Sequence, residues 1–91
     1  MRYERKPSFN RSYAHVSEAR QAQVIHAIEQ LTLAFETGQR PQGLGLRKLR
    51  HAFWEIRLGL EYRILFRLHG DLVELVVVGT HEEIRRILAN R

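Results

Sequence analysis

The fold is decided by two runs of sequence, WEIRL at residues 54–58 and YRILFRL at residues 62–68. In both runs the even positions are apolar and the odd positions are mostly charged. Neighbouring side chains on a β-strand point to opposite faces of the sheet, so this alternation predicts two strands with one core face and one arginine surface. The break at Gly59-Leu60 is short enough for a hairpin turn.

A third run, LVELVVV at residues 72–78, is almost continuously apolar, which indicates the most buried strand. Gly70-Asp71 joins it to the second run by another short turn. We therefore expect an antiparallel meander of three strands, over roughly Phe53–Leu58, Tyr62–His69 and Leu72–Val78. The charged segment Arg2–Lys6 is a candidate edge strand.

Two helices are expected before these strands. A short one starts at Pro7 and Ser8, and a longer one begins at the cap residue Ser17. The longer helix ends at Gly38, and Pro41 prevents its resumption. Its apolar positions recur at helical spacing: Val24, Ile28, Leu31 and Phe35.

The remaining segments are a loop and a third helix. Gln39–Gly45, with one proline and two glycines, is the only stretch of the sequence that is composed like a linker. Thr80 and Glu83 match a capping box, which opens a short terminal helix that runs to about Asn90.

Composition places the chain among ordinary globular proteins of a single domain. It has 91 residues, of which 44% are hydrophobic and 27% charged. Without cysteine it has no disulfide, no thiolate metal site and no thiolate nucleophile. The charged amino terminus is unlike a signal peptide, and the longest apolar run, Leu75–Val78, is far too short to span a membrane, so we expect a cytoplasmic location.

The positive charge is concentrated in one part of the chain. Residues 40–67 hold seven basic and two acidic residues, whereas the other eight basic residues are matched by eight acids. The seven are Arg40, Arg47, Lys48, Arg50, Arg57, Arg63 and Arg67. This charge indicates a polyanion such as nucleic acid, an anionic membrane surface or an acidic protein as the partner. Thirteen of the fifteen cations are arginine, whose planar fork suits phosphate and carboxylate better than lysine does.

Two arrangements of the strand arginines are possible. Arg57, Arg63 and Arg67 lie on neighbouring strands and could converge on one or two phosphates. Alternatively, they form a solvated face that pairs with Glu55 and Glu61. Seven cations against two carboxylates cannot neutralise one another, which favours a binding function.

His81 is the second candidate for chemistry. It follows the most buried strand and occupies the first position of the terminal helix, where the positive helix end disfavours the imidazolium form. A neutral histidine beside arginines suits acid–base cleavage of a phosphodiester, and the alternative is a surface histidine at a helix start. The five histidines are scattered over separate elements, so no metal site is expected.

From Leu46 to Ile87 the sequence resembles the RelE/ParE toxins of bacterial type II toxin–antitoxin systems. The resemblance lies in LRKL at residues 46–49, WEIR at 54–57, YRILF at 62–66 and VVVGTHEEI at 76–84. It implies an α+β fold: a four-stranded antiparallel sheet, two N-terminal helices packed on one face, and a short C-terminal helix. The whole chain, residues 1–91, would form one such domain.

In the RelE-like branch the resemblance implies a metal-independent endoribonuclease that needs no cofactor, cleaves ribosome-bound mRNA and is neutralised by a cognate antitoxin. The attacking group would be the 2′-hydroxyl of the RNA. Arg63 fits the strand arginine that contacts the scissile phosphate, and Arg57 the basic position one strand earlier. His81 lies where several members place a catalytic histidine or arginine. The RNA-binding residues would be Arg47, Lys48, Arg50, Arg67 and Arg85.

One departure favours a second hypothesis. Many RelE-like toxins have a tyrosine where this chain has Arg85, and arginine would impair stacking on an mRNA base. Glu55 could serve as the base instead, although a carboxylate among arginines is a weak one. The alternative is therefore a non-enzymatic protein: a ParE-like toxin that poisons gyrase, or an inactive toxin fold that only binds its antitoxin.

Overall fold

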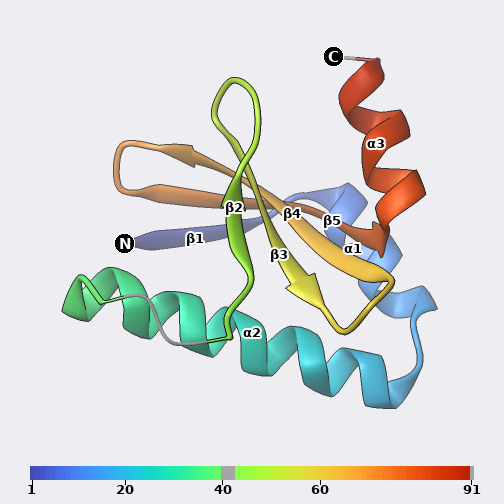
Figure 1. The fold of residues 1–91 in the computed structure, drawn as a ribbon, viewed down its shortest axis with the longest axis horizontal. Coiled ribbons are helices and arrows are strands. Elements are labelled where there is room, and N and C mark those ends of the chain that lie inside the picture. The colour runs from blue at the N-terminus through green and yellow to red at the C-terminus, as the bar shows by residue number, and fades with distance from the viewer. Residues whose placement is uncertain (40–42, 91) are drawn as a thin grey trace.

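A computed structural model describes residues 1–39 and 43–90 of the chain (Figure 1). Its elements are β1 (Arg2–Arg5), α1 (Pro7–His15), α2 (Glu18–Thr37), β2 (Leu46–Lys48), β3 (Phe53–Leu58), β4 (Tyr62–His69), β5 (Leu72–Thr80) and α3 (His81–Ala89). The expected strands, hairpins and helices are thus confirmed. Arg40 of the basic segment and Pro41 of the expected loop lie outside the described residues.

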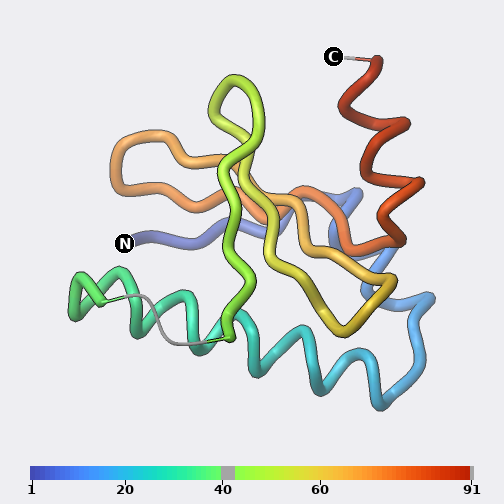
Figure 2. The backbone as a smooth tube through the Cα atoms, in the orientation of Figure 1, coloured from blue at the N-terminus to red at the C-terminus, as the bar shows by residue number. Residues whose placement is uncertain are grey.

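The five strands form one mixed sheet in the order β1-β5-β4-β3-β2. β3, β4 and β5 make the expected antiparallel meander, and β2 adds an antiparallel edge beside β3. β1 forms the other edge and runs parallel to β5, the pairing that Figure 2 shows between the blue amino terminus and the orange strand. The expected α+β class is confirmed, and the sheet differs from the four antiparallel strands expected only in having a fifth strand and one parallel pair. β2 has only three residues, too few to show an alternation, and β1 pairs with residues from the far end of the sequence.

Helices α1 and α2 carry the chain from the β1 edge to the β2 edge and bury the first core against one sheet face. Phe9 and Leu31 of the helices belong to this core with the even-numbered strand residues Ile56 and Ile64. Trp54, also even-numbered, stacks on Phe66 with ring centroids 6.4 Å apart. These aromatic side chains pack in the core, as the alternation predicted.

The opposite face of the sheet is not an open arginine surface, and that expectation is wrong. There α3 builds a second core, in which Ile84 packs with Phe53, Leu65 and Val76. The register of β4 and β5 shifts between Leu65 and Phe66, so that Val76 is an extra residue in β5. Such a β-bulge turns two successive side chains toward the same face. Val76 and its neighbour Val77 both reach the second core, which explains why this run lacks alternation.

The helix ends follow the local signals in the sequence. The Ser17 side chain accepts a hydrogen bond from the Arg20 backbone N–H at 3.1 Å, and Gly38 ends α2 in the left-handed conformation with φ of +73°. At α3 the backbone N–H of Thr80 donates to Glu83 Oε1 at 2.7 Å, and Thr80 Oγ1 accepts from the Glu83 N–H at 3.2 Å. In the part of the chain that the structure describes, no helix is both long and apolar enough to cross a bilayer.

Candidate nucleic-acid interface

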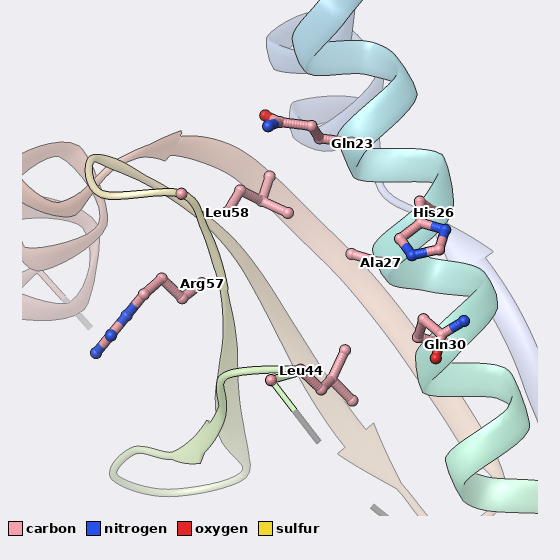
Figure 3. A pocket seen from close by; sticks show the side chains of 9 residues that line it. Gln23, His26, Ala27, Gln30, Leu44, Arg57 and Leu58 are labelled. Carbon is pink, nitrogen blue, oxygen red and sulfur yellow. The ribbon is translucent and has the colours of Figure 1, made fainter. Parts of the chain in front are cut away.

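The two central arginines form a row across the sheet on the face that carries α3. Arg57 of β3 lies directly opposite Arg63 of β4, and Arg63 lies opposite Gly79 of β5. Figure 3 shows the Arg57 side chain pointing away from α2, as expected for an odd-numbered strand residue. Arg57 is exposed, whereas Arg63 exposes only 9% of its surface. We call Arg57 and Arg63 the arginine row.

Glu55 is a buried partner of the arginine row and not an exposed base. Its Oε2 atom lies 3.5 Å from Nε of Arg63 and 3.7 Å from Nε of Arg47, and the residue is only 6% exposed. A buried carboxylate is costly unless a cation compensates it, so the Glu55–Arg63 pair belongs to the packing of the sheet. The prediction that Arg63 is a surface cation is therefore wrong.

The Arg63 guanidinium is also held by the β3–β4 turn. Its Nη1 atom donates to the carbonyl oxygen of Tyr62 at 3.1 Å and more weakly to that of Leu60 at 3.5 Å. Its Nε atom has no hydrogen-bond partner within residues 1–39 and 43–90, because Glu55 lies beyond good hydrogen-bond distance. Arg63 is thus fixed from two sides at the turn end of the sheet.

His81 lies at the same end of the sheet. It is the exposed first residue of α3, and its backbone N–H donates to the carbonyl of Glu61 in the β3–β4 turn at 2.9 Å. This bond attaches the start of α3 to the hairpin that carries the arginine row. The hydrogen bonds from Thr80 hold the pKa of Glu83 below its usual value, so a carboxylate is fixed two residues after His81.

A basic groove of about 520 Å³ separates β2 from α3. Its lining is Arg47, Lys48, Leu49, Arg50, Arg85, Leu88 and Ala89. The fold therefore brings Arg85 of the terminal helix beside cations of the β2–β3 hairpin. Arg50 additionally donates from Nη2 to the Leu88 carbonyl at the end of α3, where a cation stabilises the negative helix end.

Lys48 and Arg67 lie apart from the arginine row. Lys48 pairs in register with Trp54, and its ammonium lies 6.0 Å from the centroid of that ring, which packs on the first core. The Arg67 guanidinium lies 5.3 Å from the ring centroid of Phe53. Arg67 is four residues along β4 from Arg63, roughly 13 Å, with buried Leu65 between them. The three strand arginines therefore do not meet at one phosphate, and their convergence on two phosphates stays a prediction.

Tyr62 is a structural residue. It packs against the first core, and the guanidinium carbon of Arg20 lies 4.1 Å from its ring centroid. The sequence reasoning missed α3 as the cover of the arginine face. The signal was present, because Ile84, Ile87 and Leu88 form an apolar stripe at helical spacing.

A hollow on the side of α2 has Arg57 of the arginine row in its lining (Figure 3). It has a volume of about 230 Å³, and the polar side chains of Gln23, His26 and Gln30 face Leu44 and Leu58 across it. Within residues 1–39 and 43–90, no group of three His, Asp or Glu residues is placed to hold a metal ion.

Comparison with known proteins identifies one family. The family model described as a ParE-like toxin domain matches residues 21–86. No curated protein matches this chain in sequence.

Solved toxin structures share the fold. The RelB–RelE antitoxin–toxin complex from Methanococcus jannaschii is 20% identical, with a TM-score of 0.72 over 92% of this chain and 96% of that chain. A YoeB/ParE toxin from Agrobacterium tumefaciens is 23% identical, with a TM-score of 0.64 over 89% of this chain and 99% of that chain. The Escherichia coli DinJ–YafQ complex is 14% identical, with a TM-score of 0.61 over 92% of this chain and 98% of that chain.

Proposed function

Because this chain belongs to the ParE-like toxin family, we propose that it is the toxin of a toxin–antitoxin pair and a metal-independent endoribonuclease. Its substrate in this proposal is mRNA on the ribosome, which places its action in the cytoplasm. A cognate antitoxin binds the toxin and keeps it inactive.

The observation that carries the proposal is the arginine row beside His81. Arg57 is exposed, and the opposing Arg63 is held by Glu55 and by the turn carbonyls. Because Glu55 and the turn fix Arg63, this member of the row is ordered before any ligand arrives. The α3 start, attached to the same turn through the Glu61 carbonyl, places an imidazole at this end of the sheet.

The chemistry requires no group beyond the RNA and these side chains. The RNA 2′-oxygen forms a bond to phosphorus and the bond to the 5′-oxygen breaks, which leaves a 2′,3′-cyclic phosphate and a free 5′-hydroxyl. His81 accepts the 2′-hydroxyl proton, and a proton reaches the leaving 5′-oxygen from the imidazolium or from water. Arg57 contacts the phosphate and stabilises the charge that develops on it, while Arg63 adds positive potential from below.

The basic groove would bind the RNA on one side of the cleavage point. Arg47, Lys48 and Arg85 are exposed cations of the groove, whereas Arg50, although exposed, donates to the end of α3. Arg85 provides a planar cation where a stacking ring is absent, and guanidinium planes also stack on bases. The groove therefore contributes affinity for the strand without requiring a tyrosine.

A second candidate function is non-enzymatic. The family model is described as ParE-like, and Arg63 is too buried to reach a phosphate in this conformation. Both observations favour a toxin that acts by binding, such as a gyrase poison, or an inactive fold that only binds its antitoxin. In either case the basic surface would be covered by an acidic, partly disordered antitoxin segment.

Induced expression with mapping of cellular RNA 5′ ends tests the proposal. The nuclease predicts new cuts within translated mRNA that disappear when translation initiation is blocked. Double-strand DNA breaks without mRNA cuts would support the gyrase poison. Normal growth with intact RNA and DNA would exclude both toxin activities and support the inactive fold that only binds its antitoxin.

A further inference from the structure

A second group of cations meets where α1 begins, on the α3 face of the sheet and away from the arginine row. A hollow of about 280 Å³ is lined there by Lys6, Pro7, Ser8, Arg11, Arg67 and Val76. Arg67 comes from β4 and Arg11 from α1, so these two guanidinium groups are brought together only by the fold.

Arg67 has an unsatisfied donor. Its Nε atom is buried and has no hydrogen-bond partner in the described part of the chain. The contact with the Phe53 ring holds the guanidinium over an apolar surface that accepts no hydrogen bond of ordinary strength. The Nε atom itself is covered, whereas the residue as a whole is half-buried and lines the hollow, so an anion there would pair with the charge of the guanidinium through its other atoms.

Arg11 is the second available cation. It is exposed, and within residues 1–39 and 43–90 its guanidinium makes no ion pair. Lys6 differs, because its ammonium lies 3.1 Å from Glu4 and 3.2 Å from Glu74. Glu74 also lies 2.9 Å from the His69 ring and directly opposite Arg67 in register. Burial raises the pKa of this carboxyl, but Lys6, His69 and Arg67 lower it below its usual value. One carboxylate thus faces several cations, which leaves the hollow with an excess of positive charge.

Ser8, in the first turn of α1, lines the same hollow. Lys6 provides no side-chain cap, Pro7 has no N–H group, and the first turn contains no acidic residue. The first-turn N–H groups of Ser8 and Phe9 therefore carry the uncompensated positive end of the helix. Helix starts of this kind are favourable positions for phosphate.

We propose that this hollow is a phosphate-binding site that takes a backbone phosphate of a nucleic-acid strand. Two guanidinium forks beside the positive start of α1 match the several acceptor oxygens of one phosphate better than they match a single carboxylate. The identification of the strand as RNA rests on the proposed function, whereas the phosphate site itself does not. Because Leu65 and Ile84 lie between the hollow and the arginine row, the bound phosphate belongs to a flanking part of the strand.

Titration of the full-length, ¹⁵N-labelled protein with inorganic phosphate tests the site. The Ser8 and Phe9 amide signals and the Arg67 Nε–H signal should shift together. Arg11→Gln should weaken this binding by about five-fold or more, because it removes one charge-assisted contact. The matched control is Arg5→Gln, which removes an exposed charge from β1, where Arg5 pairs with Leu75 of the first core.

The control should bind phosphate like the wild type. If Arg5→Gln and Arg11→Gln weaken binding equally, or if the shifts are spread evenly over all basic residues, there is no specific site and the proposal is overturned.

A second arm identifies the ligand class and does not depend on cleavage. A 2′-O-methyl hexaribonucleotide, which lacks the nucleophilic hydroxyl, should displace phosphate and shift the same Ser8 and Phe9 signals. An acidic peptide of equal net charge should displace phosphate only at higher concentration. If the acidic peptide displaces phosphate at a lower concentration than the oligonucleotide does, the assignment of the ligand as a nucleic acid is overturned. A protein that binds the oligonucleotide here but cuts no mRNA would disprove the nuclease function alone.

Discussion

The Nε atom of Arg63 lies 3.5 Å from Oε2 of Glu55, and the two side chains expose only 10% and 7% of their surface. Arg57 lies directly opposite Arg63 but is exposed to solvent. The two arginines of the row are therefore different in kind: Arg63 is part of the packed sheet, and Arg57 is the cation that a ligand can reach. This difference can be measured.

Arg63→Ala should destabilise the fold. The substitution leaves the buried Glu55 carboxylate with only the longer contact to Arg47, at 3.7 Å. Loss of one partner of a buried ion pair costs about 3 kcal/mol in the free energy of unfolding, measurable by urea denaturation. Arg57→Ala should change it by no more than about 0.5 kcal/mol, because the residue is exposed. Equal stability of the two variants would show that the Glu55–Arg63 pair contributes nothing.

Arg57→Ala should instead reduce cleavage while the protein remains folded. The loss of one preorganised contact to the transition state costs a factor of about a hundred to a thousand in rate. Single-turnover cleavage of ribosome-bound mRNA measures this, with Arg5→Ala as a control that removes an equal charge from β1. A cleavage rate within two-fold of the wild type would exclude Arg57 from the site.

Gly45 should prove necessary for the position of Arg57. Its φ is +70°, a Cβ atom at this residue would lie 3.0 Å from Cβ of Arg57, and its carbonyl accepts from the Arg57 N–H at 3.2 Å. Gly45→Ala should therefore cost about 1–2 kcal/mol of stability and also slow cleavage. Gly43→Ala is a matched control, because Gly43 has φ of +82° but nothing within 4 Å of its Cβ position. If both variants cleave equally well, the contact with Arg57 is irrelevant.

His81→Ala should separate catalysis from stability. The capping box of Thr80 and Glu83 remains, and the bond from residue 81 to the Glu61 carbonyl uses the backbone, so the melting temperature should hold. The cleavage rate should fall by a factor of about a hundred to ten thousand, the usual contribution of a general acid or base. Wild-type cleavage by this variant would leave His81 as a helix-start residue only.

The attachment of α3 should weaken in acid. The pKa of Glu83 is lowered in the folded protein by the hydrogen bonds from Thr80, so its contribution to stability is complete above the ordinary glutamate pKa of 4.5. This contribution should be lost as the pH falls below 4.5 and then below the lower pKa that Glu83 has in the folded protein. Glu83→Gln should show a smaller loss of stability over that range in pH-dependent urea unfolding. Glu82→Gln, in the same helical turn but outside the capping box, should retain the wild-type dependence.

Local patterns in the sequence predicted the secondary structure well. The strand bounds Phe53–Leu58 and Tyr62–His69 follow from an alternation of side chains that each strand carries by itself. The capping box at Thr80 and the left-handed Gly38 are equally local, since each satisfies hydrogen bonds within a few residues. β2 and the parallel pairing of β1 escaped prediction, because one is too short for a pattern and the other pairs with a distant segment.

The sequence by itself determined that the excess positive charge lies within residues 40–67, that Arg57, Arg63 and Arg67 share one strand parity, and that a histidine stands at a helix start. Only the tertiary structure decided which of those arginines are accessible. α3 folds onto the charged face because Ile84, Leu65 and Val76 bury apolar surface there, and Arg63 and Glu55 become a buried pair on that face. Burial depends on which segments pack together. The apolar stripe of Ile84, Ile87 and Leu88 shows that α3 packs on another element, but it does not identify the sheet face that α3 covers.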